Sequence, residues 1–363
     1  KTVVDGSNTS GFQRTALIAR GGTIKTSEGE VRISNISLEE EACKNIQESP
    51  EEDKAGLKVW RLDRLGIPLI EIGTEPDIKS PLQCQEASKK IGILLRSLLG
   101  VKRGLGTIRQ DVNISIAGGD RIEVKGFQEL ALIPTLVELE VQRQQNLIAI
   151  HELLKKNKNL KAEEIIELNN VFSKSESKLI KSVLEKKGKI FGVKLGGFAG
   201  ILGKELQPKR RYGTEMYDHA KIYGVGGMIH SDEDLSKYKF SEAEIREIKQ
   251  KLNVQASDAF IIIADQEEKA RKGIQAALQR AELQFKVAVP REVRKANPDA
   301  TTSYMRPLPG AARMYPETDV PLIRPDLKNI QIPETLEEKF LRYQKQLGLS
   351  KDLAWGILAV DAS

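Results

Sequence analysis

The sequence predicts an α+β protein, and three observations support this class. Short runs rich in β-branched residues, such as 31–36 and 66–72, are separated by tight turns in about the first 130 residues. Apolar residues at helical spacing interrupt this pattern after Ser80 and again after Pro134. The apolar run 260–264 leads directly into another helical segment. A strand that leads into a helix in this way indicates a compact α+β unit.

The first predicted helix begins at Ser80. Ser80 provides an N-cap hydroxyl, Pro81 suits the first helical turn, and Gln83 is placed to complete a capping box. Apolar residues then recur at spacings of four, three and four between Ala87 and Leu98. This spacing predicts an amphipathic helix with one buried face.

The second half of the chain has a different texture. A second helix is predicted over 134–154, and the polar segment 157–170 is interpreted as a domain boundary. Beyond it, a glycine-rich strand region at 188–203, a helix capped by 241–244, and the strand 260–264 with its helix predict one α+β module of about 100 residues. Proline-rich sequence and a further amphipathic helix that begins near residue 334 complete the chain.

The composition excludes several classes of protein. Of 363 residues, 57 are basic and 51 acidic, which gives a formal net charge of +6. No apolar run approaches the roughly 18 residues that a membrane helix needs, and no secretory pattern opens the sequence. Cys43 and Cys84 are too few for a disulfide framework or a cysteine zinc site, so we expect a reducing cytoplasm. Because the chain opens at Lys1 within a motif, we expect an incomplete or processed piece.

Positive charge is concentrated in the middle third of the chain. One cluster lies in 181–189, and a second consists of Lys204, Lys209, Arg210 and Arg211. Clustered bases of this kind can neutralise the phosphates of a nucleic acid. A modest net charge is also compatible with an ordinary solvated surface, so both interpretations stay open.

The most informative pattern lies in the segments 107–116 and 121–125, which are joined across a pair of glycines. Period-two alternation places apolar side chains on one face of the predicted hairpin and polar side chains on the other. The polar face carries Thr107, Arg109, Asp111, Asn113, Ser115, Arg121, Glu123 and Lys125. One interpretation is the solvated face of an antiparallel sheet. The other is a site for phosphoryl transfer, which requires carboxylates that hold Mg²⁺ beside cations that hold phosphate.

Two further acidic elements stand out. Three glutamates follow Leu38, a pattern that is also typical of a helix start or a solvated turn. Glu71 interrupts an otherwise apolar strand, where a buried carboxylate needs a metal ion or a cationic partner. Arg61 and Arg64 are the nearest candidates for that partner in the sequence.

The segment 5–15 packs hydroxyl and small side chains between glycines. It is not a P-loop, because no Gly-Lys-Ser/Thr follows, and it suits either an ordinary loop or the lining of a substrate path. His151, His219 and His230 lack metal-ligand spacing and are interpreted as structural or surface residues.

Five segments together resemble the GatE family, the E component of archaeal glutamyl-tRNA(Gln) amidotransferases: 4–15, 38–41, 64–72, 106–115 and 306–321. The last is the most specific, Arg-Pro-Leu-Pro-Gly-Ala-Ala-Arg-Met-Tyr-Pro-Glu-Thr-Asp-Val-Pro. The bacterial relative, GatB, has similar Leu-Ile-Glu-Ile and Asp-x-Asn-x-Ser patterns but lacks the middle module. That module resembles the domain inserted in bacterial-type aspartyl-tRNA synthetases. The resemblance therefore covers nearly the whole chain.

The resemblance implies an architecture. A cradle-shaped catalytic domain on an antiparallel sheet would occupy 1–165 and return at 287–332. The inserted module would occupy 166–286, and a helical domain would start at 333–363.

The resemblance also implies a two-step ligase, a glutamine-hydrolysing glutaminyl-tRNA synthase. ATP, with Mg²⁺, would phosphorylate the γ-carboxylate of glutamate carried by tRNA(Gln), and ammonia would then displace the phosphate. An asparaginase-like glutaminase, the D component of the same assembly, would supply the ammonia within a heterodimer or heterotetramer. The competing class is a tRNA-binding or scaffold protein without catalysis, which would keep the module and the basic middle but not the polar hairpin face.

Site residues follow from the resemblance at matching positions. The implied metal ligands are Glu40, Glu71, Asp111 and Glu123. The implied phosphate-binding catalytic residues are Arg64, Arg109 and Lys125. Ser7, Asn8, Thr9 and Ser10 would line the ammonia path. Substrate contacts would come from Arg306, Arg313 and Tyr315, and tRNA contacts from Lys204, Lys209, Arg210 and Arg211.

Two features of the family are not matched. Its N-terminal Glu-Ile-His segment, which helps to bind metal, would lie before Lys1. Its tRNA-binding helical and tail domains would follow the last helices of this sequence.

Overall fold

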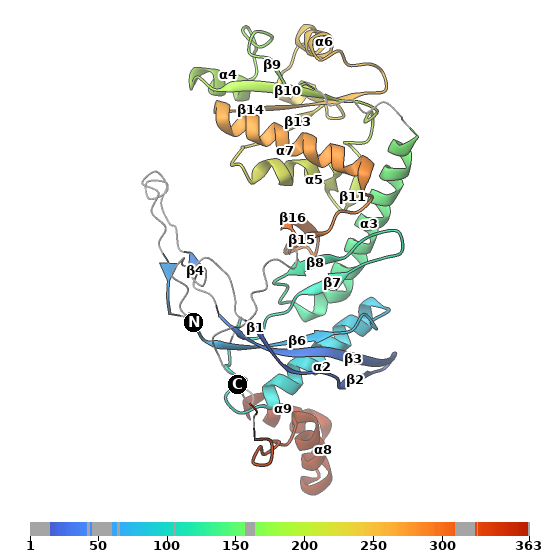
Figure 1. Cartoon of the computed structure of the whole chain (residues 1–363), viewed down its shortest axis with the longest axis vertical. Helices are drawn as coiled ribbons and strands as arrows, with labels where there is room; N and C mark the ends of the chain where they lie inside the picture. The colour runs from blue at the N-terminus through green and yellow to red at the C-terminus, as the bar shows by residue number, and fades with distance from the viewer. Residues whose placement is uncertain are drawn as a thin grey trace. The chain divides into compact units, whose positions relative to one another are not determined.

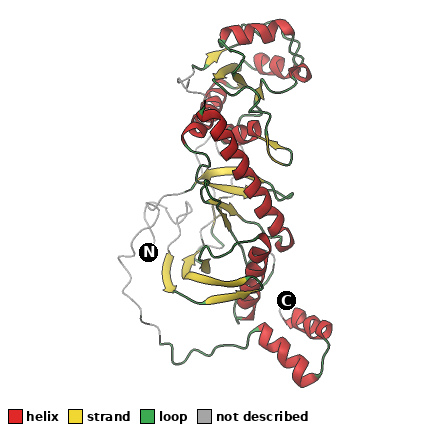
Figure 2. Cartoon of the chain, turned by 90° about the vertical axis from the view of Figure 1, so that its right-hand side faces the viewer, coloured by secondary structure: helices red, strands yellow, loops and turns green. Residues whose placement is uncertain are grey.

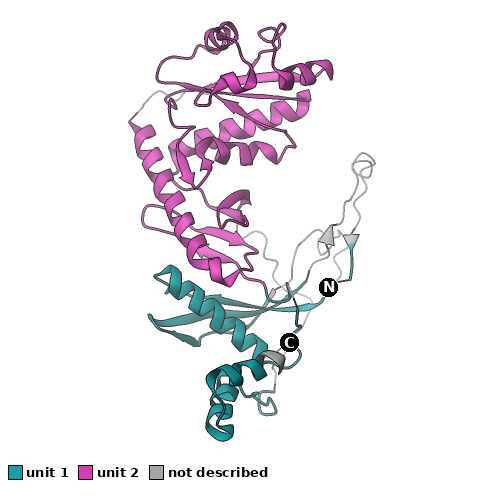
Figure 3. Cartoon of the chain, turned by 180° about the vertical axis from the view of Figure 1, so that it is seen from behind, with its two compact units in different colours: residues 1–108, 309–363 teal, residues 109–308 magenta. Residues whose placement is uncertain are grey.

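The computed structural model describes residues 15–41, 44–45, 60–63, 66–104, 106–156, 164–308, 324 and 326–361. The chain divides into two compact units: unit 1 is 1–108 with 309–363, and unit 2 is 109–308 (Figure 3). The domain predicted at 1–165 extends across this division. The physical reason is that the strands and the long helix that follow residue 109 pack against segments beyond residue 200.

Unit 1 contains a four-stranded antiparallel sheet (Figure 1). Its strands are β1 (Thr15–Ala19), β2 (Thr23–Thr26), β3 (Gly29–Glu40) and β6 (Pro68–Thr74). β3 pairs with each of the other three strands, so it organises the sheet. Two short strands, β4 (Lys44–Asn45) and β5 (Trp60–Arg61), pair separately. The predicted strand runs 31–36 and 66–72 lie largely in β3 and β6.

Helix α2 (Pro81–Ser97) begins where the sequence predicts. Its N-cap Ser80 accepts a hydrogen bond from the Gln83 backbone N–H at 3.0 Å. The Gln83 side chain accepts from the Lys79 backbone N–H at 2.8 Å, one residue before the position that a capping box uses. Ala87 is buried, whereas Leu94 on the same predicted face is exposed.

Two helices lie near the end of the chain (Figure 2), and both belong to unit 1. These are α8 (Leu336–Leu347) and α9 (Lys351–Asp361). A reciprocal capping box between Thr335 and Glu338 starts α8, and Gly348 ends it in the left-handed conformation at φ 65°. Among the described helices, none has the length and apolar character that crossing a membrane requires.

Unit 2 is built on a mixed sheet of strand order β16-β15-β8-β7. The strands are β7 (Val112–Ile114), β8 (Ile122–Lys125), β15 (Glu292–Ala296) and β16 (Thr302–Pro307). β15 pairs with β8 in parallel, and the other two pairings are antiparallel. The expected antiparallel sheet thus contains one parallel junction. Parallel neighbours need a long crossover connection, and the whole module lies in the connection between β8 and β15.

The module, residues 166–286, contains a second sheet of order β13-β14-β10-β9, antiparallel throughout. Its strands are β9 (Ile166–Glu167), β10 (Lys189–Leu195), β13 (Ile229–His230) and β14 (Ala259–Asp265), and a separate hairpin consists of β11 (Glu205–Gln207) and β12 (Arg210–Arg211). Its helices are α4 (Lys178–Glu185), α5 (Tyr212–Lys221), η2 (Leu235–Tyr238), α6 (Glu242–Lys251) and α7 (Glu267–Lys286). The predicted apolar strand is β14, and Phe260 and Ile262 pack in a core of residues from this module.

Helix α3 (Ile133–Lys155), preceded by the short helix η1 (Leu130–Leu132), connects the mixed sheet to the module within unit 2. Its apolar residues Leu136, Leu147, Ile150 and Leu154 are buried, as the spacing predicts. The same helix also buries polar residues, among them Glu140 and Arg143, that apolar spacing does not predict to be inside.

Six charged side chains form a buried ionic network in unit 2: Glu140, Arg143, Glu215, Arg280, Glu292 and Arg294. Each is at most 3% exposed. They come from α3, α5, α7 and β15, and three positive charges balance three negative ones. Because burial removes water from every member, each charge depends on the others for compensation.

Arg143 and Arg294 make most of the contacts in this network. Arg143 Nη1 donates to Glu215 Oε1 at 2.7 Å, and Arg143 Nε donates to Glu140 Oε2 at 3.0 Å. Both terminal nitrogens of Arg294 donate to the two oxygens of Glu215 at 3.0 Å, and Nη1 also donates to Glu292. Two guanidinium groups therefore share one carboxylate.

The arginines determine the charge state of Glu215. Burial alone would raise the pKa of Glu215, but Arg294, Arg143 and Arg280 lower it well below its ordinary value. Burial, reinforced by the nearby Glu215 carboxylate, raises the pKa of Glu292 although Arg294, Arg143 and Arg280 act to lower it. The three arginines thus hold Glu215 ionised.

The network joins the module to the mixed sheet. Glu215 and Arg280 belong to the module, whereas Arg143 and Arg294 lie outside it in the sequence. The polar boundary of the sequence favours a module set apart, and the module does have its own apolar core. The ionic contacts nevertheless place it in one compact unit with the sheet, because separation would expose buried charges without their partners.

We expect Glu215→Gln to lower the free energy of unfolding by about 3–5 kcal/mol, because it leaves buried arginines without compensation. Urea denaturation of the whole chain measures this change. The matched control is Glu152→Gln on α3, whose carboxylate is exposed and pairs with Lys155, and this variant should unfold like the wild type. Equal stability of Glu215→Gln and the wild type would contradict a structural role for the network.

His219 borders the buried network. Its ring stacks on Tyr304 at a centroid distance of 3.6 Å, and its Nε2 lies 4.0 Å from Glu292 Oε2. Burial, reinforced by the nearby Arg280, lowers the pKa of His219 to about 3. The interpretation of this histidine as structural agrees with its position, because a buried neutral imidazole packs as an aromatic ring.

The low pKa of His219 predicts a pH dependence of stability. Between pH 6.5 and about 3 the unfolded chain binds a proton at this site that the folded chain does not, so stability falls as the pH is lowered, by about 1.4 kcal/mol per pH unit. His219→Phe keeps an aromatic ring on Tyr304 but removes the titrating group. Between pH 5 and 6, the slope of its unfolding free energy against pH should therefore be smaller than that of the wild type by about 1.4 kcal/mol per pH unit, which corresponds to one proton. An unchanged slope would mean that His219 is not held neutral.

Candidate functional site

The hairpin β7–β8 carries the polar face that the sequence predicts. Val112 faces Val124 and Ile114 faces Ile122 in the register, and all four are buried. Asn113 faces Glu123 on the opposite side. The strand is shorter than the predicted 107–116, since β7 covers only Val112–Ile114.

Asp111 and Glu123 lie on the same side and share one cation. Lys125 Nζ donates to Asp111 Oδ2 at 2.7 Å and also pairs with Glu123 Oε1. The second oxygen of Asp111 accepts from the Gly126 backbone N–H at 3.2 Å. Burial alone would lower the pKa of Lys125, but hydrogen bonds to Asp111 and Glu123 raise it above its ordinary value. The two carboxylates are therefore close enough to bind a single positive ion.

The register extends this polar face across all four strands of the mixed sheet. One row contains Arg306, Val293, Glu123 and Asn113, and the next contains Ser303, Lys295 and Lys125. Register partners lie on the same side of a sheet. We define the polar face as the side that carries Asn113, Glu123, Lys125, Lys295 and Arg306, with Asp111 at its edge.

A β-bulge places Arg306 on the polar face. The partner of Val293 is Arg306, but the partner of Arg294 is Tyr304, so Met305 is an extra residue in β16. Without the bulge, alternation would put Arg306 on the side of Tyr304 and the buried Thr302. The resemblance implies Arg306 as a substrate contact, and the bulge places it on the same side of the sheet as Glu123.

Lys295 is a residue of this face that the sequence did not single out. It lies beside Lys125 in the parallel register and is exposed. The segment 292–295 reads Glu-Val-Arg-Lys. Its charged residues fall on both faces of an alternating strand, so the sequence does not indicate which face is polar. Glu292, Val293 and Arg294 are all buried, and only the register with β8 and the exposure of Lys295 place this lysine on the polar face.

Glu40 and Glu71 lie in unit 1, on β3 and β6. Glu71 faces Ser37, and its nearest acidic neighbour on that side is Glu39. Glu40 faces Pro68 and lies on the opposite side of the ladder. A single ion between Glu40 and Glu71 therefore requires them to reach it from opposite sides of the sheet.

The apolar run around Glu71 predicts a buried carboxylate, and this prediction is wrong, because the Glu71 side chain is exposed. The apolar run around it is on the sheet surface, where Ile70 is 49% exposed. Burial therefore supplies no argument for a metal ion at Glu71, and its proposed metal role depends on the family resemblance.

Several predicted site residues lie outside the described part of the chain. These are Ser7, Asn8, Thr9 and Ser10 of the ammonia path, Arg64 among the phosphate-binding residues, and Arg313 and Tyr315 among the substrate contacts. Arg109 is the first residue of unit 2 and lies before β7.

The predicted tRNA-binding residues lie in and around the β11–β12 hairpin. Lys204, Lys209 and Arg211 are exposed. Arg210 is different, because its guanidinium donates to Asp218 of α5 and is largely buried. Three of the four side chains are therefore available to an anionic partner on this hairpin, whereas Arg210 is held within the fold.

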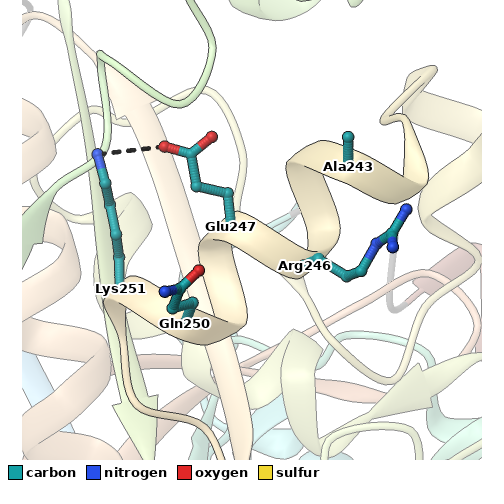
Figure 4. A pocket seen from close by; sticks show the side chains of 5 residues that line it. All are labelled: Ala243, Arg246, Glu247, Gln250 and Lys251. Carbon is teal, nitrogen blue, oxygen red and sulfur yellow. Dashed lines mark ion pairs between the residues drawn. The ribbon is translucent and has the colours of Figure 1, made fainter.

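A shallow hollow lies on α6 of the module, and Figure 4 shows the five side chains that line it: Ala243, Arg246, Glu247, Gln250 and Lys251. Glu247 and Lys251 form an ion pair at 3.5 Å. All five come from one helix, so the hollow is the outer surface of α6 and has no converging polar groups. In the described ranges, no cluster of three or more His, Cys, Asp or Glu side chains is arranged to hold a metal ion.

The fold and the polar face define a class: an α+β protein whose mixed sheet presents acidic and basic side chains on one side, with a buried ionic network on the other. A family profile described as the GatB/GatE catalytic domain matches residues 1–331. The chain therefore belongs to the GatB/GatE family, which confirms the family resemblance seen in the sequence.

Three curated relatives, each named as the E component of a glutamyl-tRNA(Gln) amidotransferase, give the scale of the similarity. The protein of Methanocaldococcus jannaschii is 50% identical over 361 residues, that of Archaeoglobus fulgidus 48% over 359, and that of Haloarcula marismortui 49% over 354. Each alignment covers 98% of this chain and 56% of the relative. The chain thus spans little more than half the length of these relatives.

Proposed function

We propose that this chain carries the transamidation site that converts Glu-tRNA(Gln) to Gln-tRNA(Gln). In the first step an oxygen of the glutamate γ-carboxylate attacks the γ-phosphorus of ATP, and the bond to ADP breaks. In the second step ammonia attacks the acyl carbon, phosphate leaves with the electron pair of the C–O bond, and the nitrogen loses a proton. The single observation that carries this proposal is the polar face, where two carboxylates share one cation beside further cations.

The physical requirement of the first step is the approach of two anions. Cationic side chains must offset the repulsion between the γ-carboxylate and the triphosphate. Lys125 and Arg306 provide positive charge on the polar face, and Arg109 precedes it in the chain. Arg64, in the segment that resembles the family, is proposed for the same role.

Asp111 and Glu123 fit the requirements of Mg²⁺. They already hold one cation, the Lys125 ammonium, between them. Mg²⁺ is commonly bound through one or two carboxylates together with substrate phosphates, so two suffice in the presence of ATP. When bound, the ion would neutralise phosphate charge. Glu40 and Glu71 stay proposed ligands from the resemblance.

The module and the partners complete the proposal. We propose that the module resembles the insert domain of bacterial aspartyl-tRNA synthetases and contacts tRNA through Lys204, Lys209 and Arg211. A glutaminase of the asparaginase type would supply ammonia, and the segment that contains Ser7 to Ser10 would line its path. Arg313 and Tyr315 are proposed substrate contacts, and the assembly would work in the cytoplasm.

We expect Asp111→Asn to reduce the formation of Gln-tRNA by on the order of a hundredfold or more. The reason is that it removes one of the two carboxylates that share the Lys125 cation. The assay supplies ammonium chloride as nitrogen donor, so that it does not depend on glutamine hydrolysis. Asp120→Asn is the matched control, since Asp120 lies in the turn between β7 and β8 of the same hairpin and pairs with Arg291. Near wild-type activity of Asp111→Asn would contradict the assignment, and glutaminase activity of the assembled enzyme should be unaffected.

Lys125→Met tests whether Asp111 and Glu123 hold a metal ion. Because Lys125 occupies the same two carboxylates, its removal should tighten Mn²⁺ binding without nucleotide by on the order of tenfold. Isothermal titration calorimetry measures the affinity, and Lys249→Met, which removes an exposed charge on α6, is the control. Weaker or unchanged Mn²⁺ binding would mean that the pair holds only Lys125.

A further inference from the structure

The parallel junction of the mixed sheet places two lysines side by side. Lys295 of β15 is the register partner of Lys125 of β8. On its other side, Lys295 faces Ser303 of β16. Neighbouring strands lie about 4.8 Å apart, so the two lysine side chains start next to each other on the polar face.

The opposite side of β15 fixes this arrangement. Glu292 and Arg294 alternate with Lys295, and both are buried in the ionic network. A slip of one residue would exchange the two faces of the strand and bury Lys295 in place of Arg294. The network therefore holds Lys295 outward and sets its position beside Lys125.

The two lysines differ in whether a carboxylate neutralises their positive charge. Lys125 pairs with Asp111 and Glu123. Within the described ranges, no carboxylate forms an ion pair with Lys295, and the same is true of Arg306 in the neighbouring row. Like charges that face each other across strands destabilise a sheet. An anion bound over the face would remove this repulsion.

We propose that Lys295 binds the polyphosphate chain of ATP, together with Lys125 and Arg306. This inference rests on the proposed function. Strand β15 lies between β8 and β16, so Lys295 stands between the strands that carry Lys125 and Arg306, on the same side of the sheet. Cations on three consecutive strands suit an extended anion such as a polyphosphate. Lys295 is a binding residue in this proposal, and it offsets the charge that the γ-carboxylate of the substrate meets.

The test uses the whole chain and compares Lys295→Met with the wild type. The affinity for ATP in the presence of Mg²⁺ is measured by calorimetry, and the melting temperature is measured without nucleotide. We expect the Kd for ATP to rise about tenfold (about 1.4 kcal/mol), while the melting temperature stays equal or increases because a like-charge contact is lost. Lys295→Arg keeps the charge and should restore most of the affinity.

Lys249→Met on α6 is the control for a general loss of positive charge. An equal loss of ATP affinity in this control, or an unchanged Kd in Lys295→Met, would overturn the inference. Loss of tRNA binding with unchanged ATP binding would overturn it as well, since the bound phosphate would then be that of RNA. If the wild type binds ATP and Lys295→Met is unchanged, only this inference fails. If the wild type does not bind ATP, the proposed function fails with it.

Discussion

The packing of unit 2 depends on a charge-balanced network of side chains that is buried from water. Arg294 is at its centre, because its guanidinium contacts Glu215 of α5, Glu292 of its own strand and Thr302 of β16. Removing a charged member leaves an uncompensated charge in a low-dielectric interior, which is far more costly than losing a surface ion pair. The helices and the strand that supply the members are therefore restricted to one arrangement.

This constraint reaches the polar face through strand alternation. Glu292 and Arg294 point into the network, so Val293 and Lys295 belong to the other side of β15. The bulge at Met305 brings Arg306 to that side as well. A buried cluster on one side of the sheet thus determines which charged side chains lie on the other side.

In the proposed function, a small number of side chains on the polar face serves an anionic substrate. Asp111 and Glu123 keep Lys125 in place in the absence of a ligand, so that the cation is neutralised and ordered. Charged groups that are positioned in advance need little reorganisation when a phosphate arrives. Membership in the GatB/GatE family agrees with a site of this kind, and the relatives are named as components of glutamyl-tRNA(Gln) amidotransferases.

The sequence by itself determined the local elements: the Ser80 start of α2, the capping box of Ser241 and Glu244, the apolar strand β14 and the alternating hairpin. Its motifs also determined the family. Only the tertiary structure decided the buried network, the parallel junction, the place of Lys295 and the exposure of Glu71. Apolar spacing treats a charged residue as solvated, and Glu215, the shared partner of Arg143 and Arg294, lies 72 and 79 residues away from them in the chain. Periodicity reports local geometry, whereas compensation of a buried charge depends on which distant segments meet.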